Sequence, residues 1–307
     1  MKKRRFDGEM ARSRRGFLKQ VGFLAGATVV PQQSFSRFSS LLQSTSSDTE
    51  MFAEKMEITI RESLADRPIG EIVVAIGSSF LGTPYAAHTL ELPGPEALVV
   101  NLRGLDCVTF VENSLALARC VKLRQHDFQE YTKQLQLIRY RGGTIDGYPS
   151  RLHYFSDWIY DNVIKGIVRD ITKEIGGVPY QKMIDFMSAH REAYRQLEDD
   201  AAVEAIRQQE TELNSRQRRY IPKEEIESHP RNIEPGDIIA MTTSIEGLDI
   251  SHTGIAVHMN GVVKYLHAPL AAGVVQISQH SLAEYLLLHK KNTGIIIARP
   301  LEPQEKN

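Results

Sequence analysis

The stretch "GLDCVTFVENSLALARC", residues 104–120, contains both cysteines of the 307-residue chain. Apolar residues recur through it every three or four positions, which is the spacing of a helix that buries one face. Asp106 stands directly before Cys107 and is a residue type that caps helices, and Gly104 lies just outside it. The pattern therefore predicts a helix that begins at Cys107.

Four roles are open to Cys107: packing in a core, pairing with Cys120, binding a metal, or attacking a substrate. On one continuous helix the two cysteines lie about 19 Å apart at 1.5 Å per residue. A disulfide needs Cα atoms within about 7 Å, so the pair does not bridge within one chain. The sequence contains no C-x-x-C, H-E-x-x-H or H-x-x-x-H motif, and we therefore expect no metal site.

A thiol on the first turn of a helix meets unpaired backbone N–H groups and the positive end of the helix dipole. Such surroundings lower the pKa of a cysteine from about 8.5 toward roughly 3.5 to 7.5, although the charge of Asp106 opposes this unless Asp106 is held as the cap. Spacing alone leaves a catalytic and a core role equally open for Cys107. Cys120, inside the helix among apolar neighbours, is expected in the core.

A nucleophilic cysteine needs a base, and the C-terminal part of the chain offers histidines on predicted strands. Five segments have strand patterns: 236–241, 251–259, 262–268, 273–278 and 294–300. Asn260 and Gly261 separate the second from the third, and Asn-Gly is the strongest signal for a two-residue hairpin turn. Such a turn pairs Met259 with Val262.

This register places His252 and His267 on one face of the hairpin as diagonal neighbours, about 7 to 8 Å apart at Cα. Gly254 then faces His267 and leaves room for one imidazole to lean toward the other. A base whose ring is oriented by a second polar group is what a thiol nucleophile requires. The alternative is a pair of structural sheet histidines.

The order of the elements indicates the fold class. The first half of the chain has helical patterns and the second half has strand patterns, which predicts an α+β fold. Helices would pack on a C-terminal antiparallel sheet or small barrel, with the nucleophile at a helix start. His252 follows Cys107 by 145 residues, a separation also found in papain-type enzymes.

The N-terminus differs in composition from the rest. The first 37 residues contain nine Lys or Arg against two Asp or Glu, whereas the remainder has 28 against 36, a net charge of −8. We therefore expect no nucleic-acid partner. "SRRGFLK" (13–19), followed by the weakly apolar run 21–30, resembles a twin-arginine export signal; the alternative is a disordered basic arm. The run is far shorter than the roughly 20 residues that span a bilayer, so stable membrane insertion is not expected.

These features predict two regions. Residues 1–49 would be a twin-arginine-type signal peptide and a Ser-rich linker, and residues 50–307 one catalytic domain with a helical insertion at about 121–232. The protein is expected to be exported, to the periplasm or an equivalent compartment, and to be a monomer.

Several longer segments carry a family resemblance: "FLGTPY" (80–85), "LDCVTFVEN" (105–113), "RYRGGTIDGYPSRLHYFSDWI" (139–159), "GLDISHTGIAV" (247–257) and "LHAP" (266–269). Together they resemble the N-acetylmuramoyl-L-alanine amidase-like branch of the NlpC-type, papain-like cell-wall peptidase superfamily. The resemblance extends over about residues 58–301. It implies that Cys107 is the nucleophile, His252 the base and His267 the residue that orients the base.

The resemblance also implies a cysteine amidase that cleaves the N-acetylmuramoyl-L-alanine bond of peptidoglycan fragments and requires no metal or organic cofactor. Tyr85 is a candidate second oxyanion donor beside the backbone N–H of Cys107; the alternative is a tyrosine buried by the preceding turn.

In the middle segment, Arg151, His153 and Asp157 are candidates for binding polar groups of the substrate. The alternative there is an internal salt-bridged clamp that only shapes the cleft. Two other functions stay open: an endopeptidase of the stem peptide, and a muropeptide-binding protein without turnover.

Overall fold

The computed structural model describes residues 42–229 and 232–304. The predicted export signal therefore lies outside the described residues. The helices are α2 (Ser46–Arg61), α3 (Ile69–Ser79), α4 (Cys107–Lys122), α5 (Phe128–Arg139), α6 (Phe155–Ile164), α7 (Phe186–Ala189), α8 (Asp200–Ser215) and α9 (Leu282–Leu288). Short 3-10 turns connect several of them, including η5 (Tyr148–Ser150) and η6 (Arg191–Ala193).

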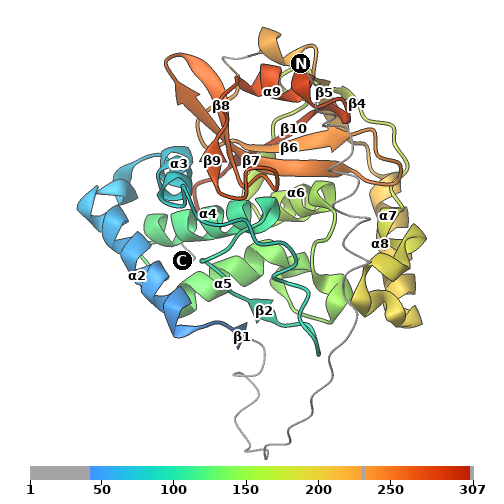
Figure 1. Cartoon of the computed structure of the whole chain (residues 1–307), viewed down its shortest axis with the longest axis horizontal. Coiled ribbons are helices and arrows are strands. Elements are labelled where there is room, and N and C mark those ends of the chain that lie inside the picture. The colour runs from blue at the N-terminus through green and yellow to red at the C-terminus, as the bar shows by residue number, and fades with distance from the viewer. Residues whose placement is uncertain (1–41, 230–231, 305–307) are drawn as a thin grey trace, which may run out of the picture.

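Most strands belong to the C-terminal part, as predicted. They are β1 (Leu42–Gln43), β2 (Leu98–Val99), β3 (Val168–Asp170), β4 (Val178–Pro179), β5 (Arg219–Pro222), β6 (Ile238–Thr243), β7 (Ile250–Met259), β8 (Val262–His267), β9 (Gln276–Ile277) and β10 (Asn292–Pro300). All but the first two form one antiparallel sheet with the order β4-β5-β10-β6-β7-β8-β9, and β3 pairs with β10. The sheet lies on the N-terminal helices (Figure 1), which confirms the α+β class.

The β7–β8 hairpin has the predicted register. Met259 pairs with Val262 and Ile255 with Leu266, so the turn consists of Asn260 and Gly261. Both turn residues have positive φ, 53° and 77°, as a type I′ turn requires. On β7, the even-numbered residues from His252 onward therefore lie on the same face of the hairpin as the odd-numbered residues of β8, including His267.

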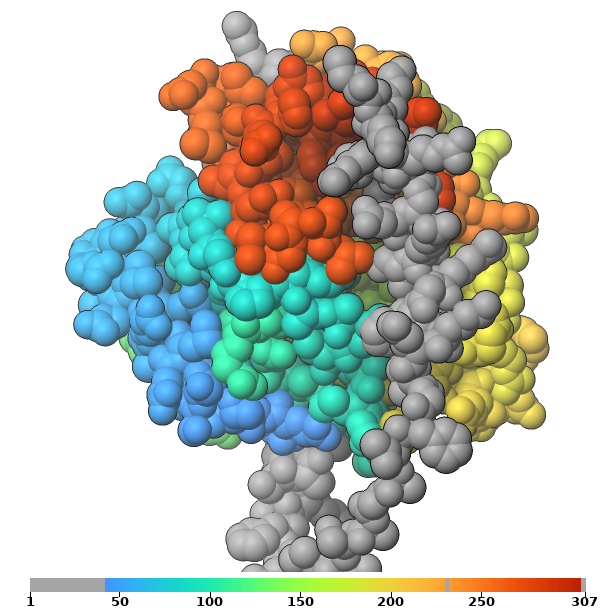
Figure 2. Space-filling view, in the orientation of Figure 1, coloured from blue at the N-terminus to red at the C-terminus, as the bar shows by residue number. Residues whose placement is uncertain are grey.

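Helix α4 is the centre of the helical part. Every residue from Thr109 to Val121 is buried, so the helix is covered on all sides rather than on one face. Helices α3 and α4 pack against the face of β7, and their apolar side chains share one core with those of β7 and β8. In the orientation of Figure 2, the helical surface, blue to cyan, meets the sheet surface, orange to red, along one boundary.

Two predicted boundaries differ from the structure. The Ser-rich linker was expected to reach residue 49, yet α2 begins at Ser46, with Thr45 as its N-cap and Asp48 closing a capping box. The Asp48 carboxylate is buried and also accepts a hydrogen bond from the backbone N–H of Leu102. Ser46 and Ser47 therefore lie in the first turn of a capped helix, a pattern readable from the Thr and Asp three positions apart.

The segment 121–232, expected as a helical insertion, contains helices α5 to α8 but also strands β3, β4 and β5. These strands pair with β10 or with each other, so the segment is built into the main sheet. Within the described ranges, no helix is both long and apolar enough to cross a membrane.

Candidate active site

Cys107 is the first residue of α4, where the sequence places it. Asp106 caps the helix: its Oδ1 accepts hydrogen bonds from the backbone N–H and from the hydroxyl of Thr109, both at 2.8 Å. The carboxylate is thereby directed toward the backbone of its own helix. Cys107 is partly exposed, and neither cysteine is in a disulfide.

Cys120 has the surroundings of a core residue. It is fully buried among apolar side chains, and this burial raises the pKa of its thiol to about 12. At neutral pH its thiol is therefore protonated and unreactive. The chain thus has one thiol that reaches solvent, at a helix N-terminus, among the described residues.

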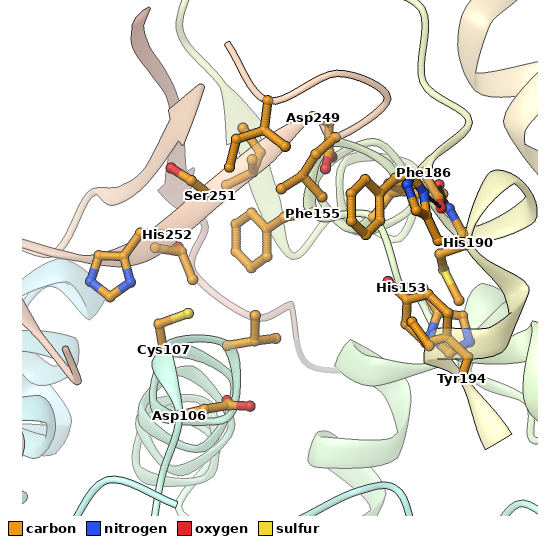
Figure 3. A pocket seen from close by; sticks show the side chains of 18 of the residues that line it. Asp106, Cys107, His153, Phe155, Phe186, His190, Tyr194, Asp249, Ser251 and His252 are labelled. Carbon is orange, nitrogen blue, oxygen red and sulfur yellow. Dashed lines mark hydrogen bonds between the residues drawn. The ribbon is translucent and has the colours of Figure 1, made fainter. Parts of the chain in front are cut away.

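His252 and His267 are brought together by the β7–β8 register. The Nε2 atom of His252 lies 2.8 Å from Nδ1 of His267, a hydrogen bond between the two rings. The strands approach closely here because Gly254 lacks a side chain: a Cβ at Gly254 would lie 2.9 Å from the Cβ of His267. Figure 3 shows His252 directed toward Cys107.

The bond between the two rings decides which nitrogen is the base. If the proton lies on Nε2 of His252, that nitrogen donates to His267 and Nδ1 of His252 keeps a lone pair for the thiol. Burial lowers the pKa of His252 to about 3, and the pKa of His267 is lowered by burial and by His252 itself. Both rings are therefore neutral at pH 7, as a general base must be before it acts.

Aromatic side chains surround the histidine pair. Tyr265 stands edge-on to His252 with ring centroids 5.7 Å apart, and Tyr285 stands edge-on to His267 at 5.2 Å. His267 is fully buried, whereas His252 is partly exposed. This packing fixes the plane of the His267 ring and so the direction of its Nδ1 atom.

Cys107 and His252 open into a cavity of about 640 Å³ (Figure 3). Its walls come from four parts of the chain: the loop around residues 88–91, the start of α4, the segment from His153 to Tyr194, and the sheet. Among the residues that line it are His88, Glu91, Asp106, Val108, His153, Phe155, Phe186, His190, Glu192, Tyr194, Leu248, Asp249, Ser251 and Lys291.

The three candidate substrate residues of the middle segment lie in different places. Arg151 is buried and forms ion pairs with Glu91 at 2.8 Å and Glu96 at 3.3 Å. Asp157 is buried and pairs with Arg141 and Arg216. Neither is among the described residues that line the cavity, so these placements favour the salt-bridged clamp over direct binding.

His153 does line the cavity. Its Nε2 bonds to the carbonyl oxygen of Tyr148 at 2.9 Å, and the two rings pack with centroids 4.3 Å apart. Burial lowers the pKa of His153 to about 3, so the ring is neutral at pH 7. Of the three candidates, it is the one positioned to meet a ligand.

Tyr85 lies beside the segment that leads into α4. It forms a parallel bridge with Leu105, two residues before Cys107, and its backbone N–H donates to the carbonyl of Gly273 at 2.7 Å. The backbone of Tyr85 is therefore fixed near the thiol, and its oxyanion role stays a prediction.

Sequence reasoning missed most of the cavity wall. Phe186 and His190 on or beside α7, and Tyr194 after η6, line the side opposite Cys107 (Figure 3). Phe155, the first residue of α6, also lines it. Only the aromatic content of these segments could have suggested a wall, because their partners are distant in the sequence. Within residues 42–229 and 232–304, no three His, Cys, Asp or Glu side chains form a group able to hold a metal ion.

Comparisons with known proteins agree with this geometry. A crystal structure of an N-acetylmuramoyl-L-alanine amidase from Bacteroides uniformis has 37% identity and a TM-score of 0.73, covering 76% of this chain and 98% of that one. A structure named as a putative xylanase from Bacteroides fragilis has 38% identity and a TM-score of 0.67, covering 73% and 98%. A Legionella pneumophila protein at 22% identity shares the fold, with a TM-score of 0.60 over 84% and 97% of the chains.

No curated protein shows a detectable match to the sequence. A family model does match: the AmiA-like family, described as N-acetylmuramoyl-L-alanine amidase-like, aligns with residues 75–295. This range includes the candidate nucleophile and both histidines. The chain therefore belongs to the N-acetylmuramoyl-L-alanine amidase-like family.

Proposed function

We propose that the protein is a cysteine amidase with a papain-like, NlpC-type fold. Its reaction is hydrolysis of the amide between the lactyl group of N-acetylmuramic acid and L-Ala in peptidoglycan fragments. The observation that carries the proposal is the 2.8 Å bond between His252 and His267 beside the exposed thiol of Cys107. Family membership supports the substrate class.

Acylation begins at the thiol. Nδ1 of His252 takes the proton of Cys107, and Sγ attacks the carbonyl carbon of the lactyl amide. The negative charge that develops on the carbonyl oxygen is stabilised by the backbone N–H of Cys107 at the start of α4, with the Tyr85 hydroxyl as a second donor. His252 then donates its proton to the leaving nitrogen of L-Ala, and the C–N bond breaks.

A lactyl thioester on Cys107 is the intermediate. Water enters, His252 takes one of its protons, and the hydroxide adds to the thioester carbonyl. The C–S bond then breaks, the sugar leaves with a lactyl carboxylate, and His252 returns its proton to the thiolate. The role of His267 throughout is to hold the proton on Nε2 of His252.

The substrate is proposed to be a soluble fragment rather than intact wall. The cavity volume of about 640 Å³ lies within the usual range for sites that enclose a small ligand, about 300 to 1,000 Å³. Export by the twin-arginine route, carried by the basic leader, is part of the same proposal because it would bring the enzyme to such fragments in the periplasm.

The test is to incubate the full-length protein with a disaccharide-tetrapeptide and weigh the products by mass spectrometry. We expect free disaccharide and intact tetrapeptide, because the lactyl amide is the bond that breaks. Cys107→Ala should abolish the products, whereas Cys120→Ala, which removes the buried thiol of the same helix, should retain them.

Other products would contradict the proposal. A sugar that still carries L-Ala-D-Glu would identify a stem-peptide endopeptidase. Absence of cleavage with several muropeptides, together with no selective labelling of Cys107 by iodoacetamide, would indicate a binding protein. Equal loss of activity in the two cysteine variants would point to a folding defect rather than to a nucleophile.

A further inference from the structure

The side of the cavity away from Cys107 has a mixed aromatic and acidic wall. Figure 3 shows His153 and Tyr194 together on this side, across the cavity from Cys107 and His252. Glu91 and Glu192 also line the cavity. Glu192 precedes Tyr194 by two residues, and Glu91 is hydrogen-bonded to Arg151, which precedes His153 by two residues. We call the wall formed by Glu91, His153 and Tyr194 the distal wall.

Glu91 is held in place from behind. Its Oε1 atom accepts a hydrogen bond from Nη2 of Arg151 at 2.8 Å, and Arg151 itself is stacked over the ring of Tyr148 at 5.0 Å. Tyr148 in turn packs on His153. The carboxylate and the aromatic ring of the distal wall are thus parts of one connected cluster, and the buried Arg151 is a positioning residue for it.

The surroundings of Glu91 contain several buried side-chain oxygens without a hydrogen-bond partner among the described residues. They are the hydroxyls of Thr89 and Tyr148, which can donate or accept, and Glu91 Oε2 and Gln196 Oε1, which only accept. Native proteins contain few such atoms, and a group of them in one place calls for an explanation. Glu91 is the member that lines the cavity: its Oε2 is buried, whereas 26% of the side chain as a whole is exposed and can meet a ligand.

Charge decides which half of the substrate suits this wall. A stem peptide carries carboxylates, which Glu91 and Glu192 would repel. On the other side of the cavity Lys291 supplies a cation, and the two carboxylates there already have partners: Asp106 accepts from Thr109, and Asp249 accepts from the backbone N–H of Ser156. A neutral sugar instead offers hydroxyl and amide donors for a carboxylate, and apolar C–H faces for aromatic rings. The wall therefore matches a sugar better than a peptide.

On these grounds we propose that the distal wall is the subsite for the N-acetylated sugar of the substrate, with Glu91 accepting hydrogen bonds from it. The inference rests on the proposed function, because it assumes that one cavity takes both halves of a muropeptide. It makes Glu91 a substrate-binding residue and assigns Arg151, which the sequence suggested for that role, to its support.

The test compares two substrates that share the scissile amide: a disaccharide-peptide and a lactyl-peptide without sugar. Glu91→Gln should lower kcat/KM about tenfold for the first, because the acceptor of the hydrogen bond loses its negative charge, and leave the second unchanged. Glu96→Gln is the matched control. It removes the other carboxylate paired with Arg151, at a site that does not line the cavity.

Binding without turnover separates this inference from the proposed function. The disaccharide alone is titrated calorimetrically into Cys107→Ala and into Cys107→Ala with Glu91→Gln or Tyr194→Leu. If the disaccharide binds in a manner that depends on Glu91 and Tyr194, but the wild-type protein cleaves no amide, the sugar subsite would stand and the amidase would be overturned. Amide cleavage with equal effects of Glu91→Gln and Glu96→Gln on both substrates would overturn the subsite and preserve the amidase.

Discussion

The histidine pair shows how one hydrogen bond selects the chemistry of a ring. His252 has two nitrogens, and only the nitrogen that carries no proton can accept one from a thiol. In the tautomer that the proposed reaction requires, Nε2 of His252 carries the proton and donates it across the 2.8 Å bond to Nδ1 of His267. His267 itself is fully buried between aromatic rings and cannot turn away.

A substitution pair tests this role of His267. In His267→Asn, the side-chain oxygen can occupy the position of Nδ1 and still accept the proton of His252, so we expect much of the activity to be retained. His267→Leu offers no acceptor, and kcat should fall about 100-fold or more with little change in KM. The measurement is steady-state kinetics on a muropeptide, with tautomer assignment by nitrogen NMR. Equal losses in Asn and Leu variants would show that His267 acts only through packing.

Among the elements, the β7–β8 hairpin sets the distance between the two histidine rings. Gly254 on β7 faces the neighbouring strand, where an added Cβ would lie 2.6 Å from the carbonyl oxygen of Leu266 and 2.9 Å from the Cβ of His267. Such contacts cannot be relieved by a side-chain rotation alone, because one of the atoms belongs to the backbone. The glycine therefore helps to set the geometry of the histidine pair although it bears no functional group.

Gly254→Ala should separate the strands at this point. We expect the free energy of unfolding to fall by about 1 to 3 kcal/mol and kcat to fall with it, because the hydrogen bond between the histidines lengthens. Gly261→Ala in the turn of the same hairpin is the control. Its φ of 77° makes alanine unfavourable by about 1 kcal/mol, yet no atom lies within 4 Å of the new Cβ. Loss of activity in both variants to the same extent would refute a specific effect at Gly254.

At the scale of the whole molecule, the cavity lies where the N-terminal helices, the segment 153–194 and the sheet meet. Titratable side chains that line the cavity are buried at this junction. Burial, together with the positive charge of Arg151, lowers the pKa of His153 to about 3. Burial raises the pKa of the Asp249 carboxyl, on the opposite wall, above its ordinary value. The lowered pKa of His153 makes the free energy of unfolding fall as the pH decreases, whereas the raised pKa of Asp249 makes it fall as the pH increases.

For His153 the direction of the pH effect follows from the two states. An unfolded histidine takes up a proton below about pH 6.5, whereas folded His153 stays neutral down to about pH 3. Its contribution to stability is complete above pH 6.5 and is lost as the pH falls toward 3, by at most about 1.4 kcal/mol per pH unit. Because Asp249 and other groups also titrate, the difference between wild type and His153→Asn isolates this contribution.

The measurement is urea unfolding of both proteins at pH 7.5, 6.0 and 5.0. We expect the stability of wild type to fall relative to His153→Asn as the pH decreases. A difference that stays constant over this range would mean that His153 is accessible to protons in the folded state.

The outcome of the sequence predictions differs between local and distant features. The helix start at Cys107, its Asp106 cap and the β7–β8 register follow from patterns within about twenty residues, and the structure confirms them. Helix α2 begins at Ser46, before the expected end of the linker at residue 49, because Thr45 and Asp48 form a capping box. The role assigned to Arg151 rested on its residue type, and the structure instead buries it between Glu91 and Glu96.

The sequence by itself therefore determined the fold class, the position of Cys107 at a helix start and the face shared by the two histidines. These depend on hydrophobic period, capping and turn chemistry, which act between near neighbours in the chain. Only the tertiary structure decided which segments wall the cavity and which charges are already paired. Glu91, Arg151 and Tyr194 meet through folding of segments up to a hundred residues apart, and no local pattern specifies such contacts.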